Sequence, residues 1–502
     1  MKILMASSEV VPFAKTGGLA DVVGALPREL ESLGHEVVVF LPAYACVFEN
    51  AEKAGLKIEP VDVELEIPIS SKIVDGRLLK TQLPDSNVVV YLAQYEEYFD
   101  RPALYGNEHG DFPDNCERFV FFSRSILEAI RLLDLKPDLI HVNDWQTGLL
   151  PALMKLEYAN TPGYEQIPTL LTIHNLAYQG NFWHWDMLLT GLDWKHFNWQ
   201  EMEHFGQLNL LKAGIVFADA INTVSPTYAR EIQMTEQGCG LDSVLQHRSH
   251  VLSGIINGID PKDWNPATDP FLPANFDVSN WQPGKAECKA KLQSELRLEI
   301  EPRKPLIGIV GRLASQKGWS LILPVLNRWL ETNDAQWAIL GTGDPDYHEV
   351  LSSMHRSFPN KMSATLGFSN EMAHRIEAAA DIFLMPSQYE PCGLNQMYSM
   401  AYGTVPVVRA TGGLADTVVN STSETIANQT ANGFSFEDFT TAGLESALSR
   451  AVRLYADQPD SWAQLVTTGM KRDWSWTASA KDYQQLYQRT IQQMNARPTF
   501  TG

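Results

Sequence analysis

The chain has 502 residues, of which 44% are apolar and 20% are charged. This length exceeds what one hydrophobic core can organise, so we expect a globular protein of at least two domains. Its 39 basic and 60 acidic residues give a net charge of −21, whose field repels nucleic acids and anionic membranes. We therefore expect neither as a partner.

The cysteines are five in number, scattered, and free of any C-x-x-C spacing. This pattern favours a reducing compartment and argues against a disulfide framework or a structural zinc site. The apolar stretch at the N-terminus is too short for a signal peptide, and no run approaches the length of a membrane span. We expect a cytoplasmic protein.

The first half of the chain alternates short apolar runs with stretches of helical periodicity such as Cys116–Leu133. We predict strands at Ile3–Ala6, Val37–Leu41, Val88–Leu92, Leu139–Val142, Thr169–Ile173, Ala220–Val224 and Val251–Ile256. Strands separated by helices predict a parallel sheet with helices on both faces, whose ligands lie beyond the carboxyl ends of the strands.

The second half restarts this alternation after a connection rich in Pro, Asn and Lys, residues 266–304, which contains a short helix near 286–296. We predict strands at Leu306–Val310, Trp337–Leu340, Ala364–Leu366, Ile382–Met385 and Val405–Val408, and a final amphipathic helix at Ser479–Met494. The pattern predicts an α/β protein with domains 1–255 and 256–475, a cleft between them, and a C-terminal helical segment, 476–502.

The hexapeptide Thr-Gly-Gly-Leu-Ala-Asp occurs twice, at Thr16–Asp21 and at Thr411–Asp416. Each copy follows a predicted strand and precedes a helical pattern. Paired glycines let backbone N–H groups turn outward, and the free N–H groups of a helix start bind anions. Lys15 adds a full charge beside the first copy. One copy alone favours a plain tight turn, whereas two copies in the same setting favour an anion-binding loop.

Two further loops follow strands of the second half. Arg312 and Lys317 flank one loop, where they could hold a diphosphate by charge-assisted hydrogen bonds or could be solvated surface cations. Glu390 stands before a Pro-Cys-Gly helix start. Its carboxylate could accept hydrogen bonds from sugar hydroxyls, or it could cap its own helix. We expect Cys392 to be a packed thiol, because no basic residue adjoins it.

Polar residues also end neighbouring strands of the first half, where Asp144 and the pair His174-Asn175 favour a shared site over isolated structural roles. A tryptophan cluster can stack on sugar rings or fill a core, and we expect the second for most of Trp183, Trp185, Trp194 and Trp199. Asp344-Pro345-Asp346 matches a metal-binding D-x-D pattern, but its glycine-rich setting favours a turn.

Taken together, these motifs resemble the bacterial and plant-type glycogen (starch) synthases, retaining glycosyltransferases with the GT-B fold of two Rossmann-like domains. The stretches that carry the resemblance are Lys15–Pro27, His141–Gln146, Thr172–Gly180, Gly311–Gly318, Glu390–Leu394 and Thr411–Thr417. The resemblance implies transfer of glucose from ADP-glucose to the 4-hydroxyl at the non-reducing end of an α-1,4-glucan, with retention of configuration. It implies no metal and no other cofactor, and a C-terminal helix that returns to the first domain.

The resemblance also assigns roles to single residues. It implies that the catalytic groups are Glu390, His174, Asp144, Lys15, Arg312 and Lys317. It implies that the donor is bound by Lys15, Gly17, Gly18, Asp21, Asn175, Asn257, Arg312, Lys317, Cys392, Gly393, Leu394, Tyr398, Thr411, Gly412 and Gly413. On the acceptor side it places Tyr105, Trp145 and Tyr178. Two positions depart from the family pattern: Tyr398 stands where many relatives of this fold have Glu, and Ala103 where the family commonly has Gly.

Two other functions stay open at this point. One is a different GT-B glucosyltransferase, with another acceptor or with UDP-glucose as donor. The other is a non-catalytic glucan-binding paralogue, which we would expect to have lost Lys15, Arg312, Lys317 or Glu390, all of which are present. The oligomeric state does not follow from the sequence.

Overall fold

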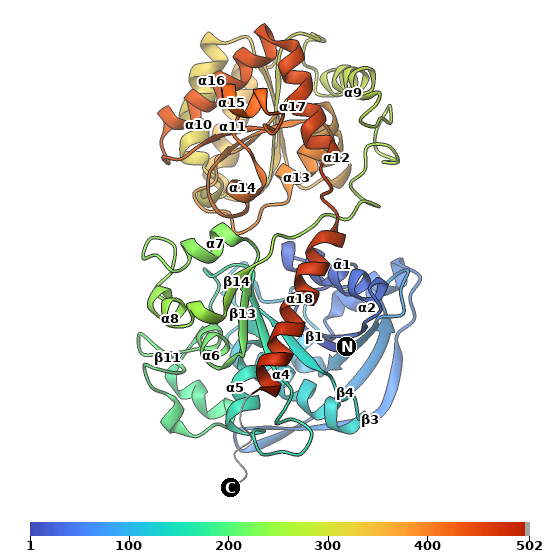
Figure 1. Ribbon diagram of the computed structural model, residues 1–502, viewed down its shortest axis with the longest axis vertical. Helices are drawn as coiled ribbons and strands as arrows, with labels where there is room; N and C mark the ends of the chain where they lie inside the picture. Colours follow the sequence, from blue (N-terminus) through green and yellow to red (C-terminus); the bar gives the residue numbers. More distant parts are fainter. Residues whose placement is uncertain (497–502) are drawn as a thin grey trace. The chain divides into compact units, whose positions relative to one another are not determined.

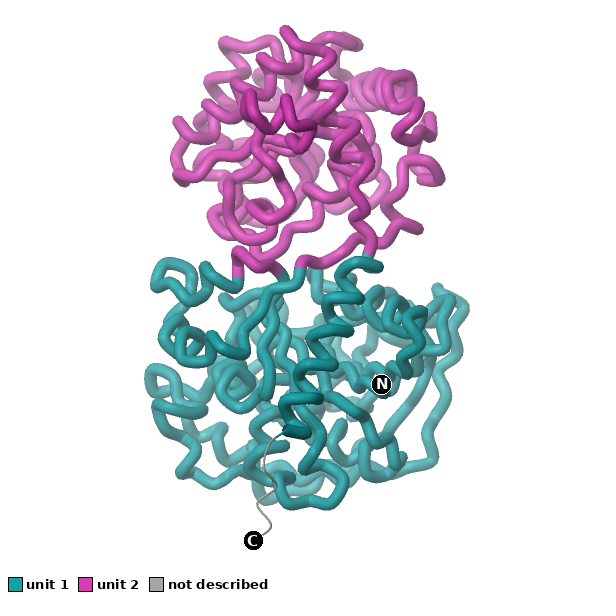
Figure 2. Tube along the Cα trace, in the orientation of Figure 1, with its two compact units in different colours: residues 1–224, 229–255, 476–502 teal, residues 225–228, 256–475 magenta. Residues whose placement is uncertain are grey.

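The computed structural model describes residues 1–496, which divide into two compact units (Figure 1, Figure 2). Unit 1 comprises Met1–Val224, Ala229–Ile255 and the segment that begins at Trp476. Unit 2 comprises Ser225–Tyr228 and Ile256–Ser475. Each unit is built around its own β-sheet.

The sheet of unit 1 has nine strands in the order β14-β13-β9-β8-β1-β2-β5-β4-β3. Seven of them, which pair in parallel, lie at or near predicted strands: β1 (Lys2–Ala6), β2 (Glu36–Pro42), β5 (Val89–Gln94), β8 (Leu139–Asn143), β9 (Thr169–Ile173), β13 (Ala220–Thr223) and β14 (Leu252–Gly254). Two small sheets lie outside this large one. One pairs β6 (Gly106–Asn107) with β7 (Gly110–Asp111), and the other places β12 (Gln207–Asn209) between β10 (Asn181–Phe182) and β11 (Glu203–His204).

The prediction of a purely parallel sheet was wrong at one edge. There β3 (Glu59–Ile69) and β4 (Lys72–Gln82) form an antiparallel hairpin, and β4 also pairs antiparallel with β5. Their side chains alternate between exposed and buried in the later part of β3 and along β4, as is typical of a sheet that buries one face. This period-two pattern mixes charged and apolar residues. It therefore lacks the continuous apolar run that predicts the parallel strands.

The helices of unit 1 connect and cover these strands, and the predicted helix at 116–133 is confirmed as α4. The helices are α1 (Gly18–Ser32), α2 (Ala45–Lys53), α3 (Glu96–Phe99), α4 (Asn115–Leu132), α5 (Leu149–Leu156), α6 (Leu210–Phe217), α8 (Asp242–His247) and α18 (Trp476–Asn495). One more helix, α7 (Pro226–Glu231), has its first residues in unit 2 and its last residues in unit 1. The last helix, α18, packs beside α1 (Figure 1). Its Tyr487 hydroxyl lies 2.9 Å from Nδ1 of the buried His141, and its Tyr483 hydroxyl accepts from Asn222 Nδ2 at 3.1 Å.

The sheet of unit 2 has six parallel strands in the order β17-β16-β15-β18-β19-β20. They are β15 (Leu306–Val310), β16 (Gln336–Gly341), β17 (Met362–Leu366), β18 (Ile382–Met385), β19 (Val405–Arg409) and β20 (Phe434–Phe436), of which only β20 was not predicted. The helices are α9 (Trp281–Glu295), α10 (Trp319–Thr332), α11 (Pro345–Ser357), α12 (Asn370–Ala379), α13 (Asn395–Ala401), α14 (Gly412–Thr417), α15 (Ser423–Ala427), α16 (Thr441–Asp457) and α17 (Pro459–Lys471).

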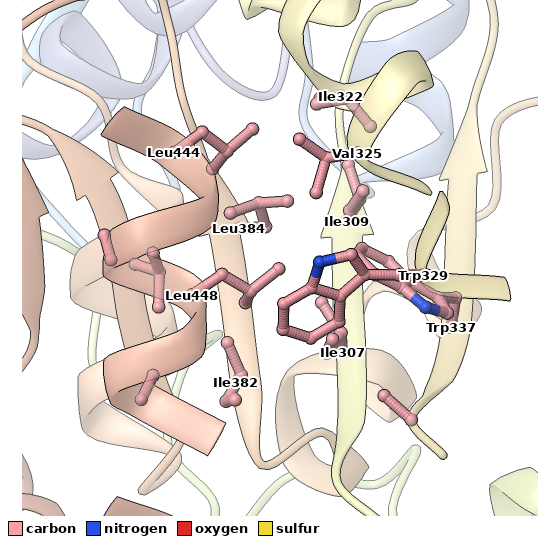
Figure 3. Packing of buried hydrophobic residues seen from close by; sticks show 14 of the residues in the cluster. Ile307, Ile309, Ile322, Val325, Trp329, Trp337, Ile382, Leu384, Leu444 and Leu448 are labelled. Atoms are coloured by element: carbon pink, nitrogen blue, oxygen red, sulfur yellow. The ribbon is translucent and has the colours of Figure 1, made fainter. Parts of the chain in front are cut away.

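One face of this second sheet packs against α10 and α16 through a buried apolar cluster (Figure 3). Ile307 and Ile309 of β15 lie between Trp329 of α10 and the leucines Leu444 and Leu448 of α16. Burial of this apolar surface holds the central strands in place, and the loops at their carboxyl ends carry the predicted site residues.

The D-x-D pattern is a helix cap. Asp344 precedes α11 and its Oδ1 accepts a hydrogen bond of 2.9 Å from the backbone N–H of Asp346, while Pro345 occupies the first turn. Among residues 1–496 there is no group of three or more His, Cys, Asp or Glu side chains that could hold a metal ion. No helix in this described range is long and apolar enough to cross a membrane.

The burial of His141 makes the stability of unit 1 depend on pH. Burial lowers the pKa of His141 to about 3, whereas the unfolded chain has the ordinary value of about 6.5. Below pH 6.5 the unfolded state therefore binds a proton that the folded state does not, so stability falls as the pH falls. Between pH 6 and 5 we expect wild type to lose about 1 kcal/mol more unfolding free energy than His141→Gln. Urea unfolding of both proteins at both pH values measures this difference. Equal losses of unfolding free energy in the two proteins would show that His141 is not held neutral by burial.

Candidate active site

The carboxyl ends of β8 and β9 bring three predicted or adjacent polar residues together. The two strands are parallel neighbours, and the next residues after them include Asp144 and His174. The backbone N–H of His174 donates to Asp144 Oδ1 at 2.7 Å, and its Nε2 lies 2.9 Å from Asn143 Oδ1. Asp144 has φ of 54°, a backbone conformation that costs energy in a non-glycine residue and is frequent at functional sites. The two strand ends are thus in contact, and the shared site stays a prediction.

Burial sets the protonation of both side chains. It lowers the pKa of His174 to about 3 and raises the pKa of Asp144 to about 7. His174 is therefore neutral at physiological pH. The amide of Asn143 donates to Ala6 O at 3.0 Å, so its oxygen accepts from His174 and the imidazole proton resides on Nε2. The Asp144 carboxyl titrates near neutrality.

The first hexapeptide copy is organised by Glu9, a residue that sequence reasoning missed. Its Oε2 accepts from the backbone N–H of Thr16 at 2.6 Å and of Gly17 at 3.1 Å. Its Oε1 accepts from the Thr16 hydroxyl at 2.5 Å and the Tyr105 hydroxyl at 2.8 Å. The prediction of an outward-facing N–H was therefore wrong at Gly17, because an internal carboxylate already binds that group. A charged residue three positions after the end of a buried strand was the signal for this role.

Beyond Glu9, the loop has open space in front of it. A Cβ atom added to Gly17 or Gly18 would meet no other atom within 4 Å. Lys15 Nζ lies 2.6 Å from Asp21 Oδ1, and the lysine side chain stays 53% exposed. Two of the predicted donor-binding residues thus contact each other at the edge of this open space.

In unit 2 the predicted residues Lys317 and Glu390 form an ion pair. Lys317 Nζ donates to Glu390 Oε2 at 2.7 Å, and the Ser387 hydroxyl donates to the same oxygen at 2.9 Å. Glu390 is buried, and the residue that precedes the first turn of α13 is Leu394. The alternative that Glu390 caps its own helix was therefore wrong. Arg312 lies on the same loop as Lys317. Its guanidinium is exposed, and its Nη2 donates to Gln316 Oε1 at 3.2 Å.

The second hexapeptide copy is used differently from the first. A Cβ at Gly412, where φ is +45°, would lie 1.9 Å from Glu390 O, and a Cβ at Gly413 would lie 2.0 Å from Cys392 O. The N–H of Gly413 donates to the carbonyl oxygens of Glu390 and Pro391. These glycines therefore let two backbone segments touch, and the prediction of an outward-facing N–H at Gly413 was wrong. Thr411 is buried beside them.

Other predicted donor residues surround this contact. Burial raises the pKa of Cys392 to about 12, so it is a thiol, as expected of a packed cysteine. Gly393 and Leu394 follow it in the same turn before α13. The Oδ1 atom of Asn257 is buried and has no hydrogen-bond partner among the described residues.

Tyr398, one of the predicted donor-binding residues, belongs to an aromatic stack. Its ring is parallel to that of Trp264, with centroids 3.7 Å apart. The ring of His374 stacks on the same indole at 3.9 Å, so the two rings must cover opposite faces of Trp264. An aromatic side chain at this position thereby fixes Trp264, a role that a glutamate could not have.

The predicted acceptor-side residues differ in exposure. Trp145 is buried, with ring centroids 4.9 Å from Phe119 and 5.6 Å from Phe182, so it serves as packing. Tyr178 is 55% exposed. Asn175, near Tyr178 in the chain, uses its Oδ1 to accept from Ala177 N at 3.0 Å.

The expectation that most of the clustered tryptophans fill a core was wrong. Trp183, Trp185, Trp194 and Trp199 are 63%, 48%, 40% and 74% exposed. The buried positions in this stretch belong instead to Met187, Thr190 and Met202.

Comparison with known proteins gives matches over nearly the whole chain. Residues 2–247 match the family model of the starch synthase catalytic domain, and residues 293–461 match that of glycosyl transferases group 1. The glycogen synthase of Rhodopirellula baltica is 47% identical, with 98% of each chain covered, and that of Thermotoga maritima is 43% identical over 98% of this chain and 99% of the relative.

Among solved structures, the catalytic domain of starch synthase IV from Arabidopsis thaliana, bound to ADP and acarbose, matches with a TM-score of 0.88. It is 35% identical, and the match covers 98% of this chain and 99% of that one. The sucrose-phosphate synthase of Thermosynechococcus elongatus matches with a TM-score of 0.59 at 18% identity, which shows a common fold alone. The predicted α/β fold class, GT-B, is thereby confirmed.

The surroundings of the two hexapeptides predict a large effect of a Gly→Ala substitution in the second copy and a small effect in the first. Gly413→Ala forces a Cβ against the Cys392 carbonyl, so we expect the free energy of unfolding to fall by about 1–3 kcal/mol. Gly18→Ala places its methyl in open space and should change that free energy by less than about 0.5 kcal/mol. Urea denaturation of both variants tests this. Similar losses in the two would contradict the distinction.

Proposed function

The chain belongs to the family of glycogen and starch synthases, which are hexosyltransferases, and from that premise we propose how it recognises and activates its donor. We propose that it transfers glucose from ADP-glucose to the 4-hydroxyl at the non-reducing end of an α-1,4-glucan with retention of configuration. ADP in the structure of the Arabidopsis relative supports an adenine nucleotide as the leaving group. We also propose a cytoplasmic location, in keeping with five cysteines that are all free.

The observation that carries the proposal is the loop of unit 2 on which Arg312 is exposed and Lys317 is held by Glu390. Cleavage of the bond between sugar and diphosphate places negative charge on the departing phosphate. Two cations on one loop can stabilise that charge in the transition state. The bound carboxylate keeps the Lys317 ammonium in place before the donor arrives.

Glu390 has a second role in this proposal. Both of its hydrogen bonds from Lys317 and Ser387 go to Oε2. Oε1 is the oxygen that we assign to a hydroxyl of the donor sugar. The Oδ1 atom of Asn257, buried without a partner among the described residues, is a second acceptor for a donor hydroxyl.

The residues of unit 1 contribute without adding positive charge near the sugar. As the bond to the leaving group breaks, the anomeric carbon becomes positive. Neutral His174 can hydrogen-bond to a sugar hydroxyl without repelling that charge, because burial keeps it unprotonated. Asp144 keeps the backbone of His174 in place, and Lys15, beside the open space in front of Gly18, supplies a phosphate contact.

The test of the donor is direct. Purified protein with glycogen should incorporate labelled glucose from ADP-glucose at a kcat/KM well above that for UDP-glucose. An exo-acting enzyme specific for α-1,4 linkages should release the label if the configuration is retained. A preference for UDP-glucose would overturn the donor assignment, and no transfer from either donor to glycogen or maltooligosaccharides would overturn the proposed function.

The proposed role of Arg312 and Lys317 in stabilising the leaving group predicts the effect of Arg312→Ala. Because Arg312 is exposed, the variant should fold normally, while kcat falls by about 10²–10³. Arg356→Ala, which removes an exposed arginine of α11, is the matched control and should leave kcat unchanged. Steady-state kinetics with ADP-glucose at saturating glycogen measure both. A well-folded Arg312→Ala variant with kcat near that of wild type would refute this role.

A further inference from the structure

We propose that Trp183, Trp185, Trp194 and Trp199 of unit 1 form a second glucan-binding site, here called the tryptophan stripe. It would bind an internal stretch of the α-glucan, away from the chain end that receives glucose. This inference rests on the proposed function for the identity of the polymer.

Three of the four rings of the stripe, those of Trp183, Trp185 and Trp194, form a continuous exposed row. The centroids of Trp183 and Trp185 are 6.4 Å apart, those of Trp185 and Trp194 are 5.2 Å apart, and Trp194 continues to Phe197 at 5.1 Å. All four tryptophans are at least 40% exposed. Contiguous apolar surface of this kind marks an interaction site, whereas single exposed rings need no explanation.

The stripe is rigid because buried groups anchor the segment beneath it. Lys212, only 3% exposed, donates from Nζ to the carbonyl oxygens of Trp199 and Glu203, both at 2.6 Å. Arg124, also buried, donates to the carbonyl of Thr190 at 2.6 Å. The rings are therefore presented outward by a folded segment, and little conformational entropy is lost when a ligand binds.

Hydrogen-bonding groups accompany the rings. Glu201 Oε2 accepts from Asn198 Nδ2 at 2.9 Å and lies 2.9 Å from His196 Nδ1, and Asp193 accepts from Lys195 N. A sugar ring has an apolar C–H face and a rim of hydroxyls, so it matches aromatic faces beside amide and carboxylate groups.

Charge excludes other occupants. The segment carries acidic and basic side chains together, and the whole chain has a net charge of −21. Such a surface attracts neither an anionic membrane nor a nucleic acid, whereas a neutral polysaccharide meets no electrostatic barrier.

In the chain, the stripe begins next to a residue that contacts the predicted acceptor side. Phe182 directly precedes Trp183, and its ring lies 5.6 Å from that of Trp145. Trp145 in turn lies 6.4 Å from Tyr105, centroid to centroid. Within unit 1, ring contacts thus link the proposed acceptor residues Tyr105 and Trp145 to Phe182, the residue that precedes the stripe in the chain.

The first experiment compares long and short acceptors with the full-length protein. In Trp185→Ala/Trp199→Ala we expect KM for glycogen to rise about tenfold, with kcat for glycogen and both constants for maltotriose unchanged. Phe368→Ala, which removes a 90% exposed ring of unit 2, is the control and should leave all constants unchanged. An unchanged KM for glycogen in the double variant would overturn the proposal.

The second experiment does not depend on catalysis. Without donor, retardation of the wild-type protein in gels that contain glycogen should exceed that of the double variant, and gels with a β-1,4-glucan should retard neither. If wild type transfers no glucose yet shows this difference, the proposed function fails and the stripe stands. If retardation is equal, the stripe fails whatever the activity.

Two outcomes complete the test. A change in sedimentation of the double variant with equal glycogen retardation would identify the stripe as a contact between copies of the chain, and would overturn the proposal. If the double variant unfolds at a lower temperature, the single variant Trp199→Ala, at the most exposed ring, gives the same comparison. It should show a smaller rise in KM for glycogen, and no rise would overturn the proposal.

Discussion

The ion pair between Lys317 and Glu390 joins the two loops of unit 2 on which the proposed donor chemistry depends. Its carboxylate is buried and is also bound by Ser387, so removing either charged partner leaves the other poorly solvated. The backbone of the Glu390 segment is held in turn by the close approach of Gly412 and Gly413. The position of the lysine charge therefore depends on packing at Gly412 and Gly413, which are remote from Lys317 in the chain.

Unit 1 uses an internal carboxylate for the same purpose. Glu9 gathers four donors from Thr16, Gly17 and Tyr105, and so fixes the loop that begins α1 before any ligand binds. One carboxylate thereby links the proposed donor loop to a residue proposed for the acceptor side. In both units a buried acidic group preorganises a loop that would otherwise lose entropy on binding an anion.

Burial also selects the charge state of the strand-end residues. The same desolvation that keeps His174 neutral raises the pKa of Asp144 to about 7. A histidine in water would be partly protonated at physiological pH and would oppose the positive charge of a breaking glycosidic bond. The fold thus adapts ordinary side chains to this chemistry by excluding water from them.

The sequence by itself determined the strands of both sheets that are continuous apolar runs, such as Thr169–Ile173, and it identified the family through motifs such as Glu390–Leu394. These features are local, because a buried parallel strand needs apolar residues on both faces. Only the tertiary structure decided that Glu9 binds Tyr105, 96 residues away, that the two copies of one hexapeptide have different roles, and that the tryptophans face outward. Partners and exposure depend on residues remote in the chain, so no local pattern encodes them.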